Sequence, residues 1–414
     1  MGFLQFLRQN APFLSAGFLL SFTSSYGQTF FISLFAGEIM RDFDLSHGQW
    51  GLIYTIATTV SALAMVWAGV LTDRFRVRYL MVVVSILLAL SCIAMAGAQG
   101  AVVLGVVIFA LRLNGQGMMS HLSIVAMARW FNATRGKAIS ISSMGFAMGQ
   151  AVLPLAFVAL LAWVDWRLLW LLAAAIVLAT APIIFRLLRE ERTPQSVAES
   201  SAALGMGGRH WTRGEMVKNW LFWGVLPLMI GPPAFGTALF FHQVHLTEVK
   251  GWELAGFVSL LPLFTAVSVL TTFTSGGLID RIGTRRLMQV IFVPFVLAFF
   301  VLGQAQTLWG AALGMMIFGI CTGAQSTIPS AFWAEHYGTR HIGSIKALVT
   351  AILVFGSAIG PGLTGLLIDL GIDFPDQMTG ISIYFALTGI LAAVTVEKAA
   401  RFFASPAQVD VVGT

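Results

Sequence analysis

The sequence has very little charge and almost no cysteine. Only 10% of its 414 residues are Asp, Glu, Lys or Arg, whereas about 25% is usual in soluble domains. So few charged side chains could not cover the surface of a soluble protein of this length. The composition therefore excludes a cytosolic enzyme and a disordered chain. Both cysteines, Cys92 and Cys321, lie in apolar runs, so neither a disulfide framework nor a thiolate metal site is expected.

The sequence also lacks a nucleotide-binding motif. The chain contains no Gly-x-x-x-x-Gly-Lys-[Ser/Thr] motif and no sizeable soluble segment that could hold a nucleotide domain. Transport driven directly by ATP hydrolysis on this chain is therefore excluded. We expect no catalytic residues, no cofactor and no metal, and hence a protein that is not an enzyme.

Long apolar segments are present instead. The AVILMFWYC set makes up 57% of the chain, and the mean hydropathy is +0.85. A helix needs about 20 largely apolar residues to cross a bilayer. By that measure we predict an all-α membrane protein with twelve transmembrane helices. They cover residues 12–35, 50–71, 79–98, 101–127, 138–161, 167–187, 219–246, 254–278, 287–306, 309–332, 343–368 and 380–397.

The distribution of Lys and Arg predicts the orientation. With a cytoplasmic N-terminus, the inside segments hold 19 Lys or Arg residues and the outside loops hold three. Cytoplasmic loops carry such an excess in multi-pass proteins. We therefore predict a protein of the inner (plasma) membrane with both termini in the cytoplasm. The net charge of +6 then needs no nucleic-acid partner to explain it.

The chain is an internal repeat. Residues 69–81 read GVLTDRFRVRYLM and residues 276–288 read GGLIDRIGTRRLM, so seven of thirteen positions agree at an offset of 207. The same offset relates Gly149 to Gly356 and Pro154 to Pro361. A fixed offset at separated places indicates duplication. We predict two pseudo-symmetric six-helix bundles, 1–187 and 219–414, joined by a cytoplasmic linker loop, 188–218.

The repeated loop resembles that of the major facilitator superfamily, whose pattern is close to G-x-x-x-D-R-x-G-R-[RK]. The residues concerned are Gly69, Asp73, Arg74 and Arg78 in the first copy and Gly276, Asp280, Arg281 and Arg285 in the second. In the first copy, Arg76 replaces the expected glycine. The resemblance implies two bundles that rock by alternating access around a midplane site. It also implies that these loops latch one conformational state, although they could serve only to orient the chain.

Arg112 is the only charged residue near the middle of a predicted span. Gln116, Ser120 and Ser123 lie on the same helical face. Since burying a charge in hydrocarbon is costly, and a guanidinium can bind a carboxylate through two hydrogen bonds, we predict that Arg112 and Gln116 bind an anionic substrate. A structural role is the alternative, because helix four of the superfamily often carries an Arg before a glycine-rich stretch.

Two further helices carry polar residues on one face, and these helices line the cavity in the superfamily. Tyr26 and Gln28 lie on predicted helix one, with Thr29 adjacent, and Thr322 and Gln325 lie on predicted helix ten. These four are predicted substrate-binding residues. Single Ser and Thr residues in membranes are, however, often bonded only to their own backbone.

Histidines are candidates for proton coupling or gating, because imidazole titrates near physiological pH. His242 and His245 lie near the predicted outer mouth, and His121 lies on helix four. The alternative is a role as interfacial anchors. No clear Asp or Glu lies in the middle of a span, which weakens the hypothesis of a drug–proton exchanger.

A second resemblance narrows the function. Residues 130–138 read WFNATRGKA, similar to the W-F-x-x-x-R-G-x-A stretch of monocarboxylate and oxalate/formate carriers. Unlike those carriers, predicted helix eight has no cation, and Lys346 lies near the start of helix eleven. We predict a monomeric secondary transporter of a small organic anion, a carboxylate, with proton symport. The alternatives are a carrier of a larger neutral or aromatic solute, such as a drug or vitamin, and a non-transporting membrane sensor.

Overall fold

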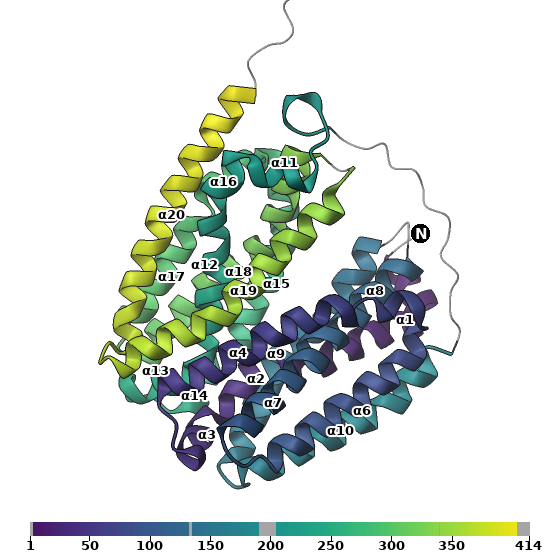
Figure 1. Cartoon of the computed structure of the whole chain (residues 1–414), viewed down its shortest axis with the longest axis vertical. Helices are drawn as coiled ribbons and strands as arrows, with labels where there is room; N and C mark the ends of the chain where they lie inside the picture. Colours follow the sequence, from purple (N-terminus) through teal and green to yellow (C-terminus); the bar gives the residue numbers. More distant parts are fainter. Residues whose placement is uncertain (1–2, 132–134, 190–203, 339, 404–414) are drawn as a thin grey trace, which may run out of the picture. The chain divides into compact units, whose positions relative to one another are not determined.

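The structure is a computed structural model that describes residues 3–131, 135–189, 204–338 and 340–403. Every regular element in these residues is helical (Figure 1). The first half of the chain forms α1 (Phe3–Thr23), η1 (Ser24–Gly27), α2 (Thr29–Ile32), η2 (Ser33–Phe35), α3 (Ala36–Phe43), α4 (His47–Ala68), α5 (Leu71–Arg74), α6 (Val77–Ala96), α7 (Ala101–Leu111), η3 (Arg112–Met119), α8 (Ser120–Trp130), α9 (Arg135–Leu161) and α10 (Trp166–Leu187).

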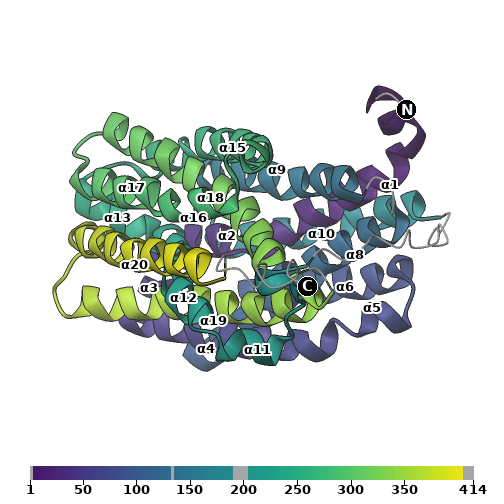
Figure 2. The same ribbon diagram turned by 90° about the horizontal axis from the view of Figure 1, so that it is seen from above.

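The second half continues in the same way, and Figure 2 shows the ribbon from above. It forms η4 (Met206–Gly208), α11 (Arg213–Lys218), α12 (Trp220–Phe241), α13 (Gln243–Lys250), α14 (Leu254–Val258), α15 (Leu261–Ile282), α16 (Thr284–Val290), α17 (Phe292–Gln304), α18 (Leu308–Tyr337), α19 (Ile342–Asp369) and α20 (Phe374–Phe403).

Eleven helices in the described part of the chain are long and apolar enough to cross a membrane. The predicted span 12–35 differs from expectation, because it is not one continuous helix but passes from α1 through η1, α2 and η2. The cause is a close crossing with η3, a π-helical segment. A Cβ added to Gly27 would lie 2.7 Å from the Cα of Gly115, and one added to Gly115 would lie 2.6 Å from the Cα of Gly27. Backbones that touch at glycines leave no room for regular side chains, and π-helical bulges are common at such functional crossings.

The described residues form two compact units. Unit 1 comprises Met1–Glu199, Thr237–Thr265 and Ser357–Phe374, and unit 2 comprises Ser200–Gly236, Ala266–Gly356 and Pro375–Thr414. Unit 1 therefore includes the ends of several helices from the second half of the chain. The division into bundles at 188–218 rests on the sequence duplication and stays a prediction.

The described part of the predicted linker is anchored in unit 2. Trp211 donates its backbone N–H to the carbonyl of Tyr337, at 3.0 Å, and its indole N–H to the carbonyl of Met206, at 3.0 Å. Thr212 and Glu215 then form a capping box at the start of α11. Because the backbone and hydroxyl of Thr212 donate to the carboxylate, the pKa of Glu215 lies below its usual value.

Candidate functional site

Arg112 lies at the start of η3 in unit 1 and is 1% exposed. Its Nη1 donates to the carbonyl of Gly27, at 3.3 Å, and to Oγ1 of Thr29, at 3.2 Å. The guanidinium carbon lies 5.3 Å from the ring centroid of Tyr54 on α4, and the hydroxyls of Thr29 and Tyr54 are hydrogen-bonded to each other. The glycine crossing described above thus places a backbone carbonyl and two hydroxyl-bearing side chains around one buried cation.

The charge of Arg112 has no counter-ion in this environment. Among the described residues it forms no ion pair, and its buried Nε has no hydrogen-bond partner. An unpaired buried charge is costly, so such groups in membrane proteins commonly belong to a binding or coupling site. A negative charge beside Arg112 would offset this cost.

The other predicted residues of unit 1 have different surroundings. Tyr26 is 1% exposed and packs edge-on against Phe31, with ring centroids 5.1 Å apart. Its hydroxyl has no hydrogen-bond partner among the described residues. Gln28 is buried and precedes α2, while Gln116 is half-buried within η3. The residues that contact Arg112 are Thr29 and Tyr54, and the sequence analysis missed Tyr54. The rarity of Tyr, with five in the chain, and its position inside an apolar span were the available signals.

Ser123, predicted on the face of Arg112, belongs to a packing network. Its hydroxyl contacts the hydroxyls of Ser21 and Ser142 and donates to the carbonyl of Gly17, at 2.8 Å. This network joins α8 to α1 and α9. Since its hydroxyls are satisfied by one another, their role here is helix packing.

Unit 2 contains a cavity of about 460 Å³ between α12, α18 and α19. It brings the predicted residues Thr322 and Gln325 together with Lys346. The full lining is Pro232, Pro233, Thr322, Gln325, Ser326, Pro329, Ser330, Trp333, Lys346, Val349, Thr350 and Leu353. The wall is therefore mixed, with one cation, hydroxyl and amide groups, an indole, and several apolar side chains.

Several polar groups in this cavity remain available. The Nε2 of Gln325 lies 3.8 Å from the sulfur of Met229, but its Oε1 has no hydrogen-bond partner, and neither does the buried Nε1 of Trp333. Lys346 is exposed and forms no ion pair with another described residue. Thr322, in contrast, donates to Ser268, at 3.0 Å, and to its own helix backbone. Lys346 is thus accessible to a solute, Gln325 and Trp333 each keep a buried polar atom without a partner among the described residues, and Thr322 is already satisfied.

Helices α4 and α19 meet at glycines in unit 1. A Cβ on Gly51 would lie 2.6 Å from the carbonyl oxygen of Pro361, and a Cβ on Gly365 would lie 2.5 Å from the carbonyl oxygen of His47. A Cβ on Gly362 would lie 2.5 Å from Oγ1 of Thr55. Only glycine permits so close a contact between the two backbones.

A carboxylate secures the same crossing. Asp369, the last residue of α19, accepts hydrogen bonds from the hydroxyl of Ser46, at 2.6 Å, and from the backbone N–H of Gly48, at 2.9 Å. Ser46 is the N-cap of α4, where the helix dipole favours an anion. We call the contacts of Ser46, Gly48, Gly51, Gly362, Gly365 and Asp369 the α4–α19 latch.

Three histidines gather beside this latch, and His47 was not among those predicted. The ring centroid of His47 lies 4.4 Å from that of His245 and 6.3 Å from that of His242. The Nε2 of His242 donates to the carbonyl of Pro361, at 3.1 Å. The Nε2 of His245 lies 3.3 Å from Oδ1 of Asp373, without the geometry of a hydrogen bond. His121 does not join this group, since it lies on α8 with its Nε2 3.4 Å from Oγ1 of Thr72.

The side chains of the two repeated loops form different contacts. Arg78 donates its Nε to the carbonyl of Phe185, at 3.2 Å, and Arg285 bonds Glu397 on α20, at 2.5 Å. Asp280 is exposed and forms no ion pair with another described residue. The side chain of Asp73 lies outside the described residues. The remaining members are exposed or half-buried: Gly69, Arg74, Gly276 and Arg281.

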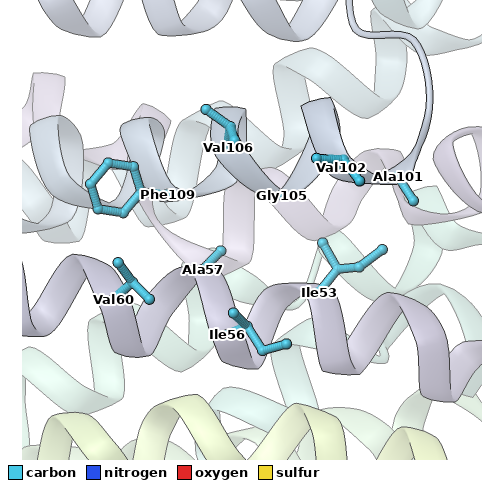
Figure 3. A pocket seen from close by; sticks show the side chains of 9 residues that line it. All are labelled: Ile53, Ile56, Ala57, Val60, Ala101, Val102, Gly105, Val106 and Phe109. Carbon is cyan, nitrogen blue, oxygen red and sulfur yellow. The ribbon is translucent and has the colours of Figure 1, made fainter.

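Unit 1 also contains an apolar cavity. It measures about 600 Å³ and lies between α4 and α7, with Ile53, Val60 and Phe109 among its lining residues (Figure 3). Every side chain labelled in Figure 3 is apolar. Such a surface on two spanning helices is suited to contact lipid chains and offers nothing to orient a polar solute. Within the described residues, no group of three His, Cys, Asp or Glu could hold a metal ion.

The helical fold and the long apolar spans indicate a multi-pass membrane protein. The sequence model of the Major Facilitator Superfamily matches residues 17–361 and 256–409. The chain belongs to this family and is a transporter. The resemblance in the repeated loops is thereby confirmed.

Relatives and solved structures agree with this assignment. The chain is 23% identical over 335 residues to a "Probable nitrate/nitrite transporter NarK2" of Mycobacterium tuberculosis, covering 80% of this chain and 82% of that one. It is 24% identical over 373 residues to a "Probable 4-methylmuconolactone transporter" of Cupriavidus pinatubonensis, covering 78% and 84%. The fold matches a bacterial homolog of the human lysosomal transporter Spinster, with a TM-score of 0.68 and 16% identity over 94% of this chain and 95% of that one. It also matches the nucleoside transporter NupG, with a TM-score of 0.68 and 13% identity over 94% and 100%.

Proposed function

We propose that the protein is a secondary transporter that moves a small organic anion, a carboxylate, across the inner membrane by alternating access. The observation that carries this proposal is Arg112, a fully buried guanidinium with no carboxylate partner among the described residues. A carboxylate substrate would neutralise it and could bind two guanidinium nitrogens. Two relatives are described as transporters of nitrate/nitrite and of 4-methylmuconolactone, and anion transport by this chain is consistent with the first.

The cavity of unit 2 favours an organic anion over an inorganic one. Trp333, Val349 and Leu353 provide an apolar wall, while Gln325 and Lys346 provide hydrogen-bond donors. A planar inorganic anion would leave the apolar wall in contact with water, whereas an organic body would cover it. The same wall supports the second candidate, a larger neutral or aromatic solute. A neutral solute, however, would not neutralise the charges of Arg112 and Lys346.

The α4–α19 latch supports an alternating-access cycle. Separating the two helices would break two hydrogen bonds of Asp369, the hydrogen bond from Thr55 to the carbonyl of Ala358, and a glycine crossing. We propose that the latch closes the outer side of the carrier, opposite the repeated loops. The predicted cytoplasmic termini place the 46–48 and 369–373 segments outside.

Protons would act on this latch through its three histidines. Closing brings His47, His242 and His245 together, and like charges at 4.4–6.3 Å repel in a partly buried setting. Asp369, Asp373 and Glu248 oppose this repulsion, and Arg41 and Glu38 lie on α3, which packs against α13. A second or third proton on the histidines would therefore favour separation of the outer ends.

The experiment is uptake by purified protein in proteoliposomes, with and without an inward proton gradient. The matched solutes are benzoate and benzamide, which share their shape and differ in charge, together with lactate and nitrate. We expect transport of one or both carboxylates, stimulated by the gradient, and none of benzamide. Transport of benzamide equal to that of benzoate would favour the neutral-solute candidate instead. Nitrate as the preferred solute would reject an organic substrate.

A further inference from the structure

A second cationic site lies at one end of unit 1, away from Arg112. A cavity of about 540 Å³ opens between α1 and α10, where the predicted spans reach the cytoplasmic side. Its lining consists of Pro12, Phe13, Ile183, Arg186, Leu187 and Arg189. The two helices pack against each other along this stretch. Four of the six lining residues are apolar and two are arginines, so the cavity has an amphipathic lining.

The order of these residues along α10 matches the order of layers in a membrane. Ile183 and Arg186 lie on α10 at a spacing of three, on one side of the helix, and Arg189 lies two residues past the helix end at Leu187. At a rise of about 1.5 Å per residue, Arg186 lies about 4.5 Å beyond Ile183, and Arg189 follows beyond the end of the helix. The spanning part of α10 ends at Leu187. The apolar wall therefore lies at the depth of acyl chains, and the arginines lie at the depth of headgroups.

Cations at this end of the bundle are concentrated and unpaired. Arg186 and Arg189 are exposed, and neither forms an ion pair with another described residue. Arg78 contacts the same helix end, with its guanidinium carbon 3.9 Å from the ring centroid of Phe185. None of the lining residues is acidic. Glu190 and Glu191 follow in the sequence and lie outside the described residues.

We propose that the α1–α10 cavity binds an anionic phospholipid, with the headgroup phosphate at Arg186 and Arg189 and an acyl chain along Pro12, Phe13 and Ile183. Guanidinium groups bind phosphate oxygens in a bidentate manner. Ile183 is 51% exposed, and an acyl chain would cover it whereas a soluble phosphate would not. Basic pockets between spanning helices on the cytoplasmic side are suited to anionic lipids. This site is independent of the transported solute.

The test measures binding of phosphatidylglycerol with a fluorescent acyl chain to the purified full-length protein in neutral detergent. Phosphatidylcholine with the same label is the control lipid. We expect phosphatidylglycerol to bind much more tightly than phosphatidylcholine. The double variant Arg186→Gln/Arg189→Gln should bind phosphatidylglycerol about 30-fold more weakly, or about five-fold for each arginine, as expected for a cation beside an anionic headgroup.

Two controls separate this site from general charge and from a soluble anion. Arg213→Gln/Arg286→Gln removes two exposed cations elsewhere and should leave binding unchanged; an equal loss in this variant would overturn the proposal. Displacement of the lipid by millimolar inorganic phosphate would overturn the lipid assignment. Arg186→Lys/Arg189→Lys keeps the charge but loses the bidentate geometry, and should weaken binding less than the Gln double variant does. If the Gln double variant fails to purify, equal binding of the two lipids to the wild-type protein would still reject the proposal.

Discussion

In unit 1 the cation Arg112 is 1% exposed and bonded to Gly27 and Thr29, whereas in unit 2 the cation Lys346 is exposed in an open cavity. One carboxylate in each unit shows the same difference in hydrogen bonding and exposure. Asp369 in unit 1 caps α4 through two hydrogen bonds, while Asp280 in unit 2 is exposed and forms no ion pair within the described residues. In both of these comparisons the group in unit 1 is held in closed contacts, and its counterpart in unit 2 is accessible.

In the alternating-access cycle that we propose, this difference assigns the contacts that would change. A carrier that alternates has to open contacts on one side as it closes them on the other. The contacts of the α4–α19 latch are formed in this structure. In the second repeated loop, the carboxylate of Asp280 is exposed and available for a contact. In the proposed function the two cations have different roles. Arg112 needs an anion to offset the cost of burying its charge, whereas Lys346 is exposed and can attract an anion without that cost.

The largest effect is expected at Arg112. Arg112→Gln should weaken binding of an anionic substrate by more than about 100-fold, since removing one partner of a buried pair costs about 3–5 kcal/mol. Arg112→Lys should also bind poorly, because an ammonium group cannot reproduce the planar fork. Equilibrium binding to purified protein is the measurement, with Arg41→Gln, an exposed cation, as the control. A folded Arg112→Gln protein that binds the anion with wild-type affinity would show that Arg112 is structural.

The α4–α19 latch can be broken by one methyl group. Gly51→Ala would place a Cβ 2.6 Å from the carbonyl oxygen of Pro361, and overpacking of this kind costs about 1–3 kcal/mol. The equilibrium should shift by about 5- to 150-fold toward separated helix ends. Maleimide labelling of Ser33→Cys, whose position is buried in unit 1, should rise in this background.

Gly105→Ala on α7 is the matched control for this measurement, because its added Cβ would meet only Ile53, at 3.6 Å. Equal labelling in the Gly51→Ala and Gly105→Ala backgrounds would mean that the crossing does not limit opening.

A smaller effect is expected in unit 2. Lys346→Gln should raise the KM for an anion by up to about five-fold, since an exposed ion pair contributes at most about 1 kcal/mol. Lys346→Arg should retain the wild-type KM, and Lys218→Gln on α11 controls for overall charge. Initial uptake rates over a range of substrate concentrations give the measurement. An unchanged KM in Lys346→Gln would remove Lys346 from the substrate site.

The smallest effect concerns pH. Because protonated imidazoles repel in the closed latch, labelling of Ser33→Cys should increase only as the external pH falls below the usual histidine range, since burial lowers the pKa of His245 in the closed latch. His245→Gln should reduce this dependence, whereas His121→Gln, on α8, should not. Labelling is normalised to a cysteine at an exposed position, since thiol reactivity itself changes with pH. The same pH dependence in the His245→Gln and wild-type proteins would exclude the histidines as the cause.

Much of the fold could be predicted because the bilayer imposes simple rules on composition. A span needs a long apolar run, and the runs in this chain predict eleven of the spanning helices found in the structure. The first predicted span was the exception. Its break depends on Gly27 meeting Gly115, and the two residues are distant in the sequence, so no local pattern could reveal the contact.

The features of the candidate site divide in the same way, into those read from the sequence and those found only in the structure. The sequence by itself determined the membrane class, the family motif and the unusual position of Arg112. Long apolar runs, a repeated motif and a single charge within a run can all be read directly from the order of residues. Only the tertiary structure decided that Thr29 and Tyr54 surround Arg112, that Lys346 joins Gln325 in one cavity, and that Asp369 caps α4 beside His47, His242 and His245. These groupings join helices far apart in the chain, and close packing at glycines selects which helices meet.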